Sequence, residues 1–150
     1  MLNKFNCDKF ITMKVIIING PNLNLLEHRN KDVYGIVSFD DYYLKLKQQY
    51  AIQIDYYQSN IEGELIDKIQ EIGFTYDYII LNAGGYTHTS VAIADCVELI
   101  SCPVIEVHIS NIYSRETFRH KSLLSKHCVG CIVGLGLNSY NLAIDHIISG

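Results

Sequence analysis

Hydrophobic residues recur along the chain in two alternating patterns, short continuous runs and longer stretches with helical spacing. Five runs rich in Ile, Val and Tyr predict strands over 14–20, 53–59, 76–82, 103–110 and 131–135. Apolar residues at helical spacing predict helices over 38–50, 62–72, 90–100 and 138–148. Ser38 stands where a helix cap is expected, and Gly73 follows the second predicted helix as a stop signal.

Strands that alternate with helices indicate a parallel sheet covered on both faces by right-handed crossovers. Five strands in 150 residues predict an α/β protein, a flavodoxin-like three-layer sandwich with strand order 2-1-3-4-5. We expect one domain over 14–150, preceded by an extension over 1–13 that has no clear period and need not be ordered. Ligands of such sheets bind beyond the carboxyl ends of the strands, at the switch between the first and third strands.

The composition excludes several classes of protein. The net charge of −4 lacks the basic footprint of a nucleic-acid-binding protein. No apolar stretch approaches the ~18 residues of a transmembrane helix, so no membrane partner is expected. Five cysteines without an export signal favour reduced thiols and a cytoplasmic protein. Charged residues are only 19% of the chain, which favours assembly with other copies of the chain.

Cys128 and Cys131 form a CxxC pair. A redox pair would open a helix, where the dipole lowers a thiol pKa, but this one opens an apolar, strand-like run. A zinc site built on it would need a second pair at short spacing, which the sequence lacks. Buried structural thiols are therefore the favoured interpretation, with redox chemistry and zinc binding as the alternatives.

Polar side chains cluster where the predicted strands end. They are Asn22, Arg29 and Tyr34 after the first strand, Asn82 and His88 after the third, and Glu106, His108 and Ser110 on one face of the fourth. The carboxyl ends of parallel strands share one edge, so we expect these groups to converge. A short basic cluster over 115–127 suits a small anionic ligand.

Several of these residues also have an interpretation without function. Asn22 fits a turn, because Asn tolerates left-handed backbone, and His88 fits a loop before a capped helix. Arg29 fits a solvated loop charge. Glu106 and His108 can form a structural pair, or a carboxylate that fixes the tautomer of an imidazole.

Arg29 and Tyr34 lie five residues apart in the loop after the first strand. A phenol has a pKa of about 10, and lowering it to about 7 requires about 4 kcal/mol. One guanidinium about 4 Å away, at an effective dielectric of about 20, supplies that much. A tyrosine base with a histidine acid suits an elimination or hydration that uses neither metal nor cofactor. The sequence also lacks spaced His motifs and a complete phosphate-binding loop.

Five segments carry a family resemblance. They read NGPNLNLLEHRNKDVYG, YQSNIEGELIDKI, YTHTSVAIADC, PVIEVHISNIYSRETFRHKS and GLGLNSYNLAI. In this order, from about Lys14 to the C-terminus, they resemble the type II 3-dehydroquinate dehydratase family. The resemblance implies a shikimate-pathway or quinate-using enzyme that converts 3-dehydroquinate to 3-dehydroshikimate. The implied reaction is an anti elimination through an enolate without Schiff base, metal or cofactor, and the implied assembly is a homododecamer of four trimers.

The resemblance assigns a catalytic role to five matching residues. Tyr34 matches the base that takes the proton beside the ketone, and Arg29 matches the lid-loop residue that activates it. Asn22 matches the residue that holds a water against the enolate oxygen. His108 matches the acid that protonates the departing hydroxyl, with Glu106 as its partner.

The remaining site positions implied by the resemblance bind substrate. They match Asn82, His88, Asp95, Ile109, Ser110 and Arg119. In the family, the position of Asp95 reaches the site of a neighbouring subunit. The positions of Ile109 and Ser110 hold the substrate carboxylate.

The chain departs from the family pattern at two places. Glu27 stands where the family usually has Gly, and it could pair with Arg29 and weaken its hold on Tyr34. The common NPGAYTHTS reads NAGGYTHTS here, with Ala83 and Gly85 as the differences. Two other hypotheses are a paralogue made weakly active by Glu27 and a non-catalytic flavodoxin-like module that binds a small metabolite.

Overall fold

Five parallel strands form the single sheet of the computed structural model, which describes residues 12–28 and 37–150. The strands are β1 (Lys14–Asn19), β2 (Gln53–Gln58), β3 (Tyr78–Asn82), β4 (Val104–His108) and β5 (Gly130–Val133). Their order is β2-β1-β3-β4-β5, and all neighbouring pairs are parallel. The predicted order and fold class are therefore confirmed.

Some predicted strand bounds were wrong for local reasons. Tyr76 was expected in the third strand, but its N–H donates to the Ile72 carbonyl at 3.2 Å and continues the turn after a helix. The fourth strand ends at His108 rather than at Ser110. The fifth strand ends at Val133, because Gly134 adopts a φ of 89° and turns the chain out of the sheet.

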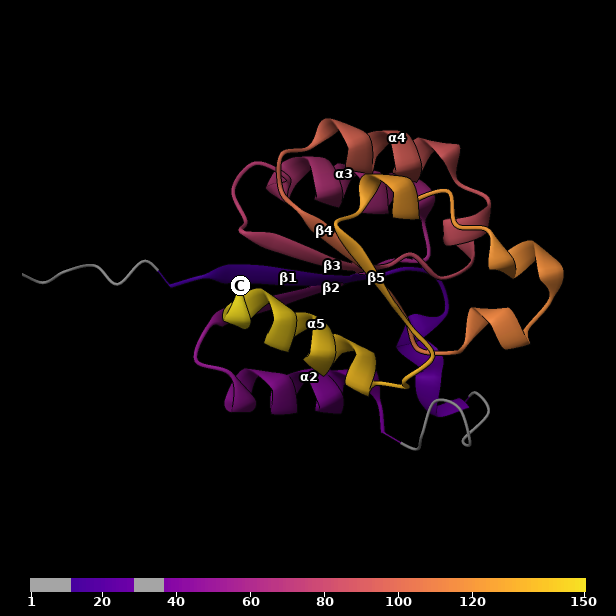
Figure 1. Ribbon diagram of the computed structural model, residues 1–150. Coiled ribbons are helices and arrows are strands. Elements are labelled where there is room, and N and C mark those ends of the chain that lie inside the picture. The colour runs from indigo at the N-terminus through magenta and orange to yellow at the C-terminus, as the bar shows by residue number, and fades with distance from the viewer. Residues whose placement is uncertain (1–11, 29–36) are drawn as a thin grey trace, which may run out of the picture.

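Helices cover both faces of the sheet, as Figure 1 shows. One face carries α2 (Phe39–Gln49) and α5 (Asn138–Ser149), and the other carries α3 (Glu62–Ile72) and α4 (Val91–Leu99). Two serine caps begin helices at the expected places. The Ser38 hydroxyl accepts the Asp41 N–H at 3.2 Å, and the Ser90 hydroxyl accepts the Ile93 N–H at 2.9 Å.

The hydrophobic core has two halves, one on each side of the sheet. Val15 and Ile17 of β1 pack in the half that contains Tyr140 of α5. Ile16 and Ile18 pack in the half under α3 and α4. Because β1 is buried on both faces, its sequence is a continuous apolar run rather than an alternation.

Short 3-10 helices gather beyond the carboxyl ends of the strands (Figure 1). They are η1 (Leu23–His28) after β1, η2 (Gly84–His88) after β3, and η3 (Ile112–Ser114) and η4 (Thr117–His120) after β4. A fifth, η5 (Ser125–His127), leads into β5. None of the helices in the described part of the chain has the length and apolar character that crossing a bilayer requires.

A close contact joins the segments that follow β1 and β3. The Gly20 N–H donates to the Asn82 carbonyl at 2.8 Å. A Cβ atom at position 20 would lie 2.4 Å from the Ala83 carbonyl oxygen, so only glycine fits there. This contact brings the polar residues after the first strand beside those after the third.

Candidate active site

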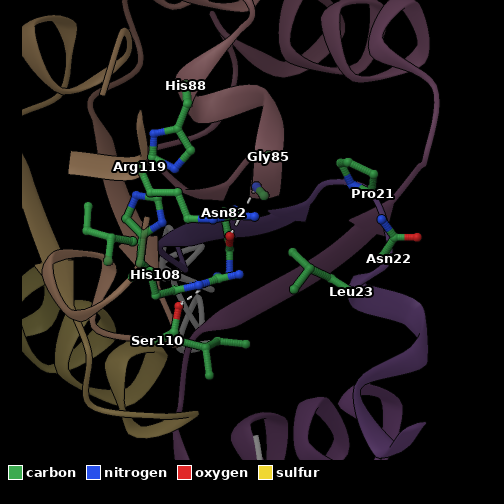
Figure 2. A pocket seen from close by; sticks show the side chains of 13 residues that line it. Pro21, Asn22, Leu23, Asn82, Gly85, His88, His108, Ser110 and Arg119 are labelled. Atoms are coloured by element: carbon green, nitrogen blue, oxygen red, sulfur yellow. Dashed lines mark hydrogen bonds between the residues drawn. The ribbon is translucent and has the colours of Figure 1, made fainter. Parts of the chain in front are cut away.

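A cavity of about 170 Å³ opens at the carboxyl edge of the sheet (Figure 2). Its walls come from the segments after β1, β3 and β4, the edge expected from the strand order. Seven of the predicted site residues line it: Asn22, Asn82, His88, His108, Ile109, Ser110 and Arg119. The fold thus brings together residues that lie far apart in the sequence.

His108 and Glu106 form a buried pair on β4. The His108 Nε2 lies 2.5 Å from the Glu106 Oε1, and the two residues are 5% and 0% exposed. The other carboxylate oxygen, Oε2, accepts the Ser122 hydroxyl at 2.9 Å. A carboxylate accepts the ring hydrogen, so Nε2 carries it, and Nδ1 is the ring nitrogen left for the cavity.

His88 is held as a neutral ring beside His108. Its Nδ1 lies 2.8 Å from the Lys121 carbonyl, which can only accept, so Nδ1 carries the hydrogen. Desolvation lowers the pKa of His88 below its ordinary value and outweighs the raising effect of the hydrogen bond to Lys121. His108 and Arg119 add smaller lowering effects. The two imidazoles stack with centroids 6.1 Å apart. The Nε2 of a neutral His88 is then a hydrogen-bond acceptor.

Asn82 ends β3 in a buried network under the cavity. Its Nδ2 donates to the Tyr140 hydroxyl at 2.9 Å, and its Oδ1 accepts the Gly84 N–H at 3.2 Å. The Tyr140 hydroxyl donates in turn to the Asn19 Oδ1 at 2.8 Å. Burial keeps the pKa of Tyr140 above its ordinary value, so the phenol stays a donor. The amide of Asn82 is therefore fixed in one orientation from below.

We expect Tyr140→Phe to lower the free energy of unfolding by about 1–3 kcal/mol, because it removes the hydrogen-bond partner of the buried Asn82 Nδ2 and of the buried Asn19 Oδ1. It should also raise KM for a ligand that Asn82 binds. Denaturant unfolding and steady-state kinetics measure the two effects. Tyr42→Phe is the matched control, because the Tyr42 hydroxyl bonds Leu137 away from Asn82 and should affect stability alone. An unchanged KM in Tyr140→Phe would contradict the positioning role.

The segment leaving β4 supplies groups suited to an anion. Ile109 and Ser110 follow His108, the last paired residue of β4, so their N–H groups lie beyond the ladder with β5. The Arg115 Nη1 donates to the Ser110 hydroxyl at 3.3 Å, and both Arg115 and Arg119 line the cavity. The Arg119 Nε also donates to Glu116 at 2.8 Å. Two guanidinium groups beside the N–H groups of this segment can bind a carboxylate.

Arg115 is a site residue that the sequence named only as a member of a basic cluster. Its position five residues after Ser110, on the segment leaving a strand that carries Glu106 and His108, is the signal that could have singled it out. Tyr140 gave no such signal, because it reaches the site from below through α5.

Asn22 combines the turn interpretation with a place at the cavity. Its φ is 67°, the left-handed region that Asn tolerates better than most residues. Its N–H donates to the Asn60 Oδ1 at 2.9 Å, which fixes the turn. The side chain is exposed and lines the cavity.

Of the other four predicted site residues, two lie in the described part of the chain. Glu106 bonds His108, which lines the cavity. Asp95 is exposed on α4 and lines a separate groove of about 320 Å³ with Lys121 and Lys126. Arg29 and Tyr34 lie outside the described residues, as does any pair of Glu27 with Arg29. The roles of all the predicted site residues stay predictions.

We expect Gly85→Ala to raise the free energy of unfolding by about 0.4–1 kcal/mol, because alanine restricts the unfolded chain. A Cβ at Gly85 would meet nothing within 4 Å, and its φ is not positive. The neighbouring Gly84→Ala is the matched control. Its φ of 60° should make alanine cost about 1–2 kcal/mol. Denaturant unfolding of both variants measures the difference, and equal effects would contradict it.

The CxxC thiols are not activated. Burial raises the pKa of both Cys128 and Cys131 to about 12, although Cys131 as a whole is an exposed residue. A reactive redox pair requires the opposite shift. The expectation that both thiols are buried was wrong, because Cys128 is half-buried and Cys131 is exposed. Structural thiols remain the favoured interpretation over redox chemistry.

Comparisons with known proteins agree on one family. The family described as "Dehydroquinase class II" matches residues 13–148. The chain is 50% identical over 138 residues to a 3-dehydroquinate dehydratase of Exiguobacterium sp., covering 91% of this chain and 94% of that protein. It is 50% identical over 139 residues to a 3-dehydroquinate dehydratase of Campylobacter jejuni, covering 91% of this chain and 87% of that protein.

A solved structure supports the same assignment. The type II dehydroquinase from Butyrivibrio crossotus superposes with a TM-score of 0.85 at 46% sequence identity, covering 91% of this chain and 98% of that one. The match therefore extends from the sequence to the arrangement of the whole sheet. The chain belongs to the dehydroquinase class II family, a family of hydro-lyases.

Proposed function

We propose that this chain is a 3-dehydroquinate dehydratase, which removes water from 3-dehydroquinate to give 3-dehydroshikimate in the shikimate pathway. Membership of the family and relatives with that name support the activity. The observation that carries the proposal is the buried Glu106–His108 pair at the wall of the cavity. An oriented imidazole suits the acid that an elimination of water needs.

Substrate binding would use the groups already placed at the cavity. The N–H groups of Ile109 and Ser110, with the Ser110 hydroxyl, suit the substrate carboxylate. The Nε2 acceptor of His88 and the guanidinium of Arg119 suit its ring hydroxyls. Asn82, held by Tyr140, adds a fixed amide. These contacts would hold the substrate at its carboxylate and at its ring hydroxyls. The reacting carbon would then have little freedom to move.

The first chemical step would form an enolate. Tyr34, as a phenolate stabilised by Arg29, would take the proton from the carbon beside the ketone. Asn22 would hold a water against the enolate oxygen. These roles rest on the family resemblance, and the exposed side chain of Asn22 at the cavity mouth is compatible with the last of them.

The second step would expel the hydroxyl. The carbon–oxygen bond breaks as the enolate collapses to the conjugated enone. The hydroxyl takes the Nδ1 proton of a doubly protonated His108 and leaves as water. Glu106, bonded to Nε2, keeps the ring oriented and offsets its charge. Return of the Tyr34 proton to His108 through solvent restores both groups.

We also propose a cytoplasmic homododecamer of four trimers, in which Asp95 completes the site of a neighbouring subunit. Asp95 is exposed beside two lysines, and Val91 in the same groove is 62% exposed, which suits a contact between copies. Sedimentation of the purified chain tests the assembly. A stable monomer with full activity would contradict it.

Treatment with borohydride in the presence of 3-dehydroquinate tests the type of mechanism. No lysine lines the cavity among the described residues, and the proposed enolate route forms no imine. We therefore expect activity to survive the treatment unchanged. Lasting inactivation that depends on substrate would contradict the route.

A thermal-shift panel separates the enzyme from the alternative of a small-metabolite-binding module. We expect stabilisation by dehydroquinate or by citrate-like polyols. Stabilisation by nucleotides alone would favour the module. That alternative leaves the buried Glu106–His108 pair at the cavity without a chemical role.

A further inference from the structure

Three side chains that can bind a metal ion cluster on β4 and on β5, the last strand in the order of the sheet. They are Glu106, His108 and Cys131. Cys131 on β5 is paired with Glu106 on β4, so their side chains share one face of the sheet. His108 lies on the same face, two residues further along β4. One ligand atom from each of the three residues lies within 4.8 Å of the other two.

These ligands suit a soft divalent cation. Zn²⁺ takes thiolate, imidazole and carboxylate ligands at about 2.0–2.3 Å in a tetrahedral arrangement, which separates the ligand atoms by about 3.3–3.8 Å. The ligand atoms lie within 4.8 Å of one another, and the 2.5 Å contact between His108 Nε2 and Glu106 Oε1 must open to that spacing when the metal binds. We propose that Glu106, His108 and Cys131 form a binding site for Zn²⁺, and that the bound metal inhibits the enzyme.

The surroundings of the cluster favour this site. The Ser122 hydroxyl holds the Glu106 Oε2 at 2.9 Å, an outer contact that orients the carboxylate. Glu106 and His108 are buried, whereas Cys131 is exposed on β5, which pairs with β4 at the end of the strand order found in the described residues. The metal can therefore approach from solvent on the cysteine side.

The site does not use the CxxC motif as a pair. The Cys128 thiol donates to the Leu124 carbonyl at 3.4 Å, toward the segment before η5, and it is not part of the cluster. Cys128 is therefore a matched control for Cys131, since it has the same side chain three residues away.

Metal binding would remove the proposed acid from the reaction. Metal bonds to the His108 Nε2 and the Glu106 carboxylate replace the hydrogen bond between these two groups. The Nε2 hydrogen and the thiol hydrogen are both released to buffer, and the ring keeps one hydrogen, on Nδ1. A neutral, metal-bound imidazole no longer supplies the proton that the departing hydroxyl needs. The inhibition rests on the proposed function, whereas the binding site itself does not.

Cobalt(II) tests the binding site without any activity measurement. We expect the full-length protein to develop a thiolate-to-cobalt charge-transfer band in the near ultraviolet when Co²⁺ is added. Cys131→Ser should lose the band, and Cys128→Ser should keep it. A wild-type protein without the band, or a band that persists in Cys131→Ser, would overturn the site.

Zinc titration of the dehydration assay tests the inhibition. We expect Zn²⁺ to inhibit the wild type, EDTA to restore the rate, and Mg²⁺, which prefers oxygen ligands, to have no effect. Cys131→Ser should raise the half-inhibiting Zn²⁺ concentration by about 10- to 100-fold at unchanged basal activity, and Cys128→Ser should match the wild type. Equal zinc sensitivity of Cys131→Ser and the wild type would overturn the inhibition. Loss of basal activity in every protein would refute the proposed function, and the cobalt spectrum would still decide the site.

Discussion

Replacement of His108 by Asn is expected to lower kcat by about 10²–10⁴-fold, the range that one general acid contributes. KM should change far less, because the carboxylate and hydroxyl contacts come from other residues. His108 is buried against Glu106 at the cavity wall, so asparagine keeps a polar side chain there but offers no acidic proton. Steady-state kinetics at saturating substrate measure the loss.

Proton exchange separates the role of His108 from a general loss of structure. The His108→Asn variant should still exchange the proton beside the substrate ketone with deuterium from solvent, because the proposed base is intact. Glu106→Gln should give a smaller loss of kcat. Glutamine both donates and accepts, so it no longer fixes which ring nitrogen carries the hydrogen. A folded His108→Asn variant with nearly wild-type kcat would exclude the acid role.

Replacement of Tyr34 by Phe is expected to remove nearly all turnover, about 10²–10⁴-fold or more, while substrate still binds. The change deletes one oxygen, the atom proposed to take the proton, and leaves the ring in place. Isothermal titration with substrate should give a Kd close to the KM of the wild type. Turnover is measured in the same preparation.

The exchange experiment should give the opposite answer for Tyr34→Phe. Without the base no enolate forms, so deuterium should not enter the substrate beside the ketone. The contrast between the two variants assigns the first step to Tyr34 and the second to His108. Continued exchange in Tyr34→Phe would show that another group is the base.

Most of the fold could be predicted from the sequence because two periodicities were clear. Buried parallel strands give continuous apolar runs such as 15–18, and helices give apolar residues three and four apart. Strand ends were less predictable. Tyr76 has the composition of a strand residue but bonds back to Ile72, and this competition between turn and strand is settled by tertiary contacts.

Part of the site could also be predicted from the regular pattern of residues along a strand. Alternation along one strand placed Glu106 and His108 on one face, and the structure places them in contact. Residues that reach the site from a different helix or strand gave no sequence signal. Tyr140 lies 58 positions after the Asn82 that it orients, and Cys131 meets Glu106 only through the register of β4 and β5.

An absorbance assay with purified 3-dehydroquinate tests the proposed activity most directly, because only the dehydrated product has a conjugated enone. We expect the purified chain to generate the enone absorbance with many turnovers per active site, at a rate that added EDTA does not reduce. No enone formation by the folded, assembled protein, or formation that requires an added metal or cofactor, would contradict a dehydratase that uses only a tyrosine base and a histidine acid.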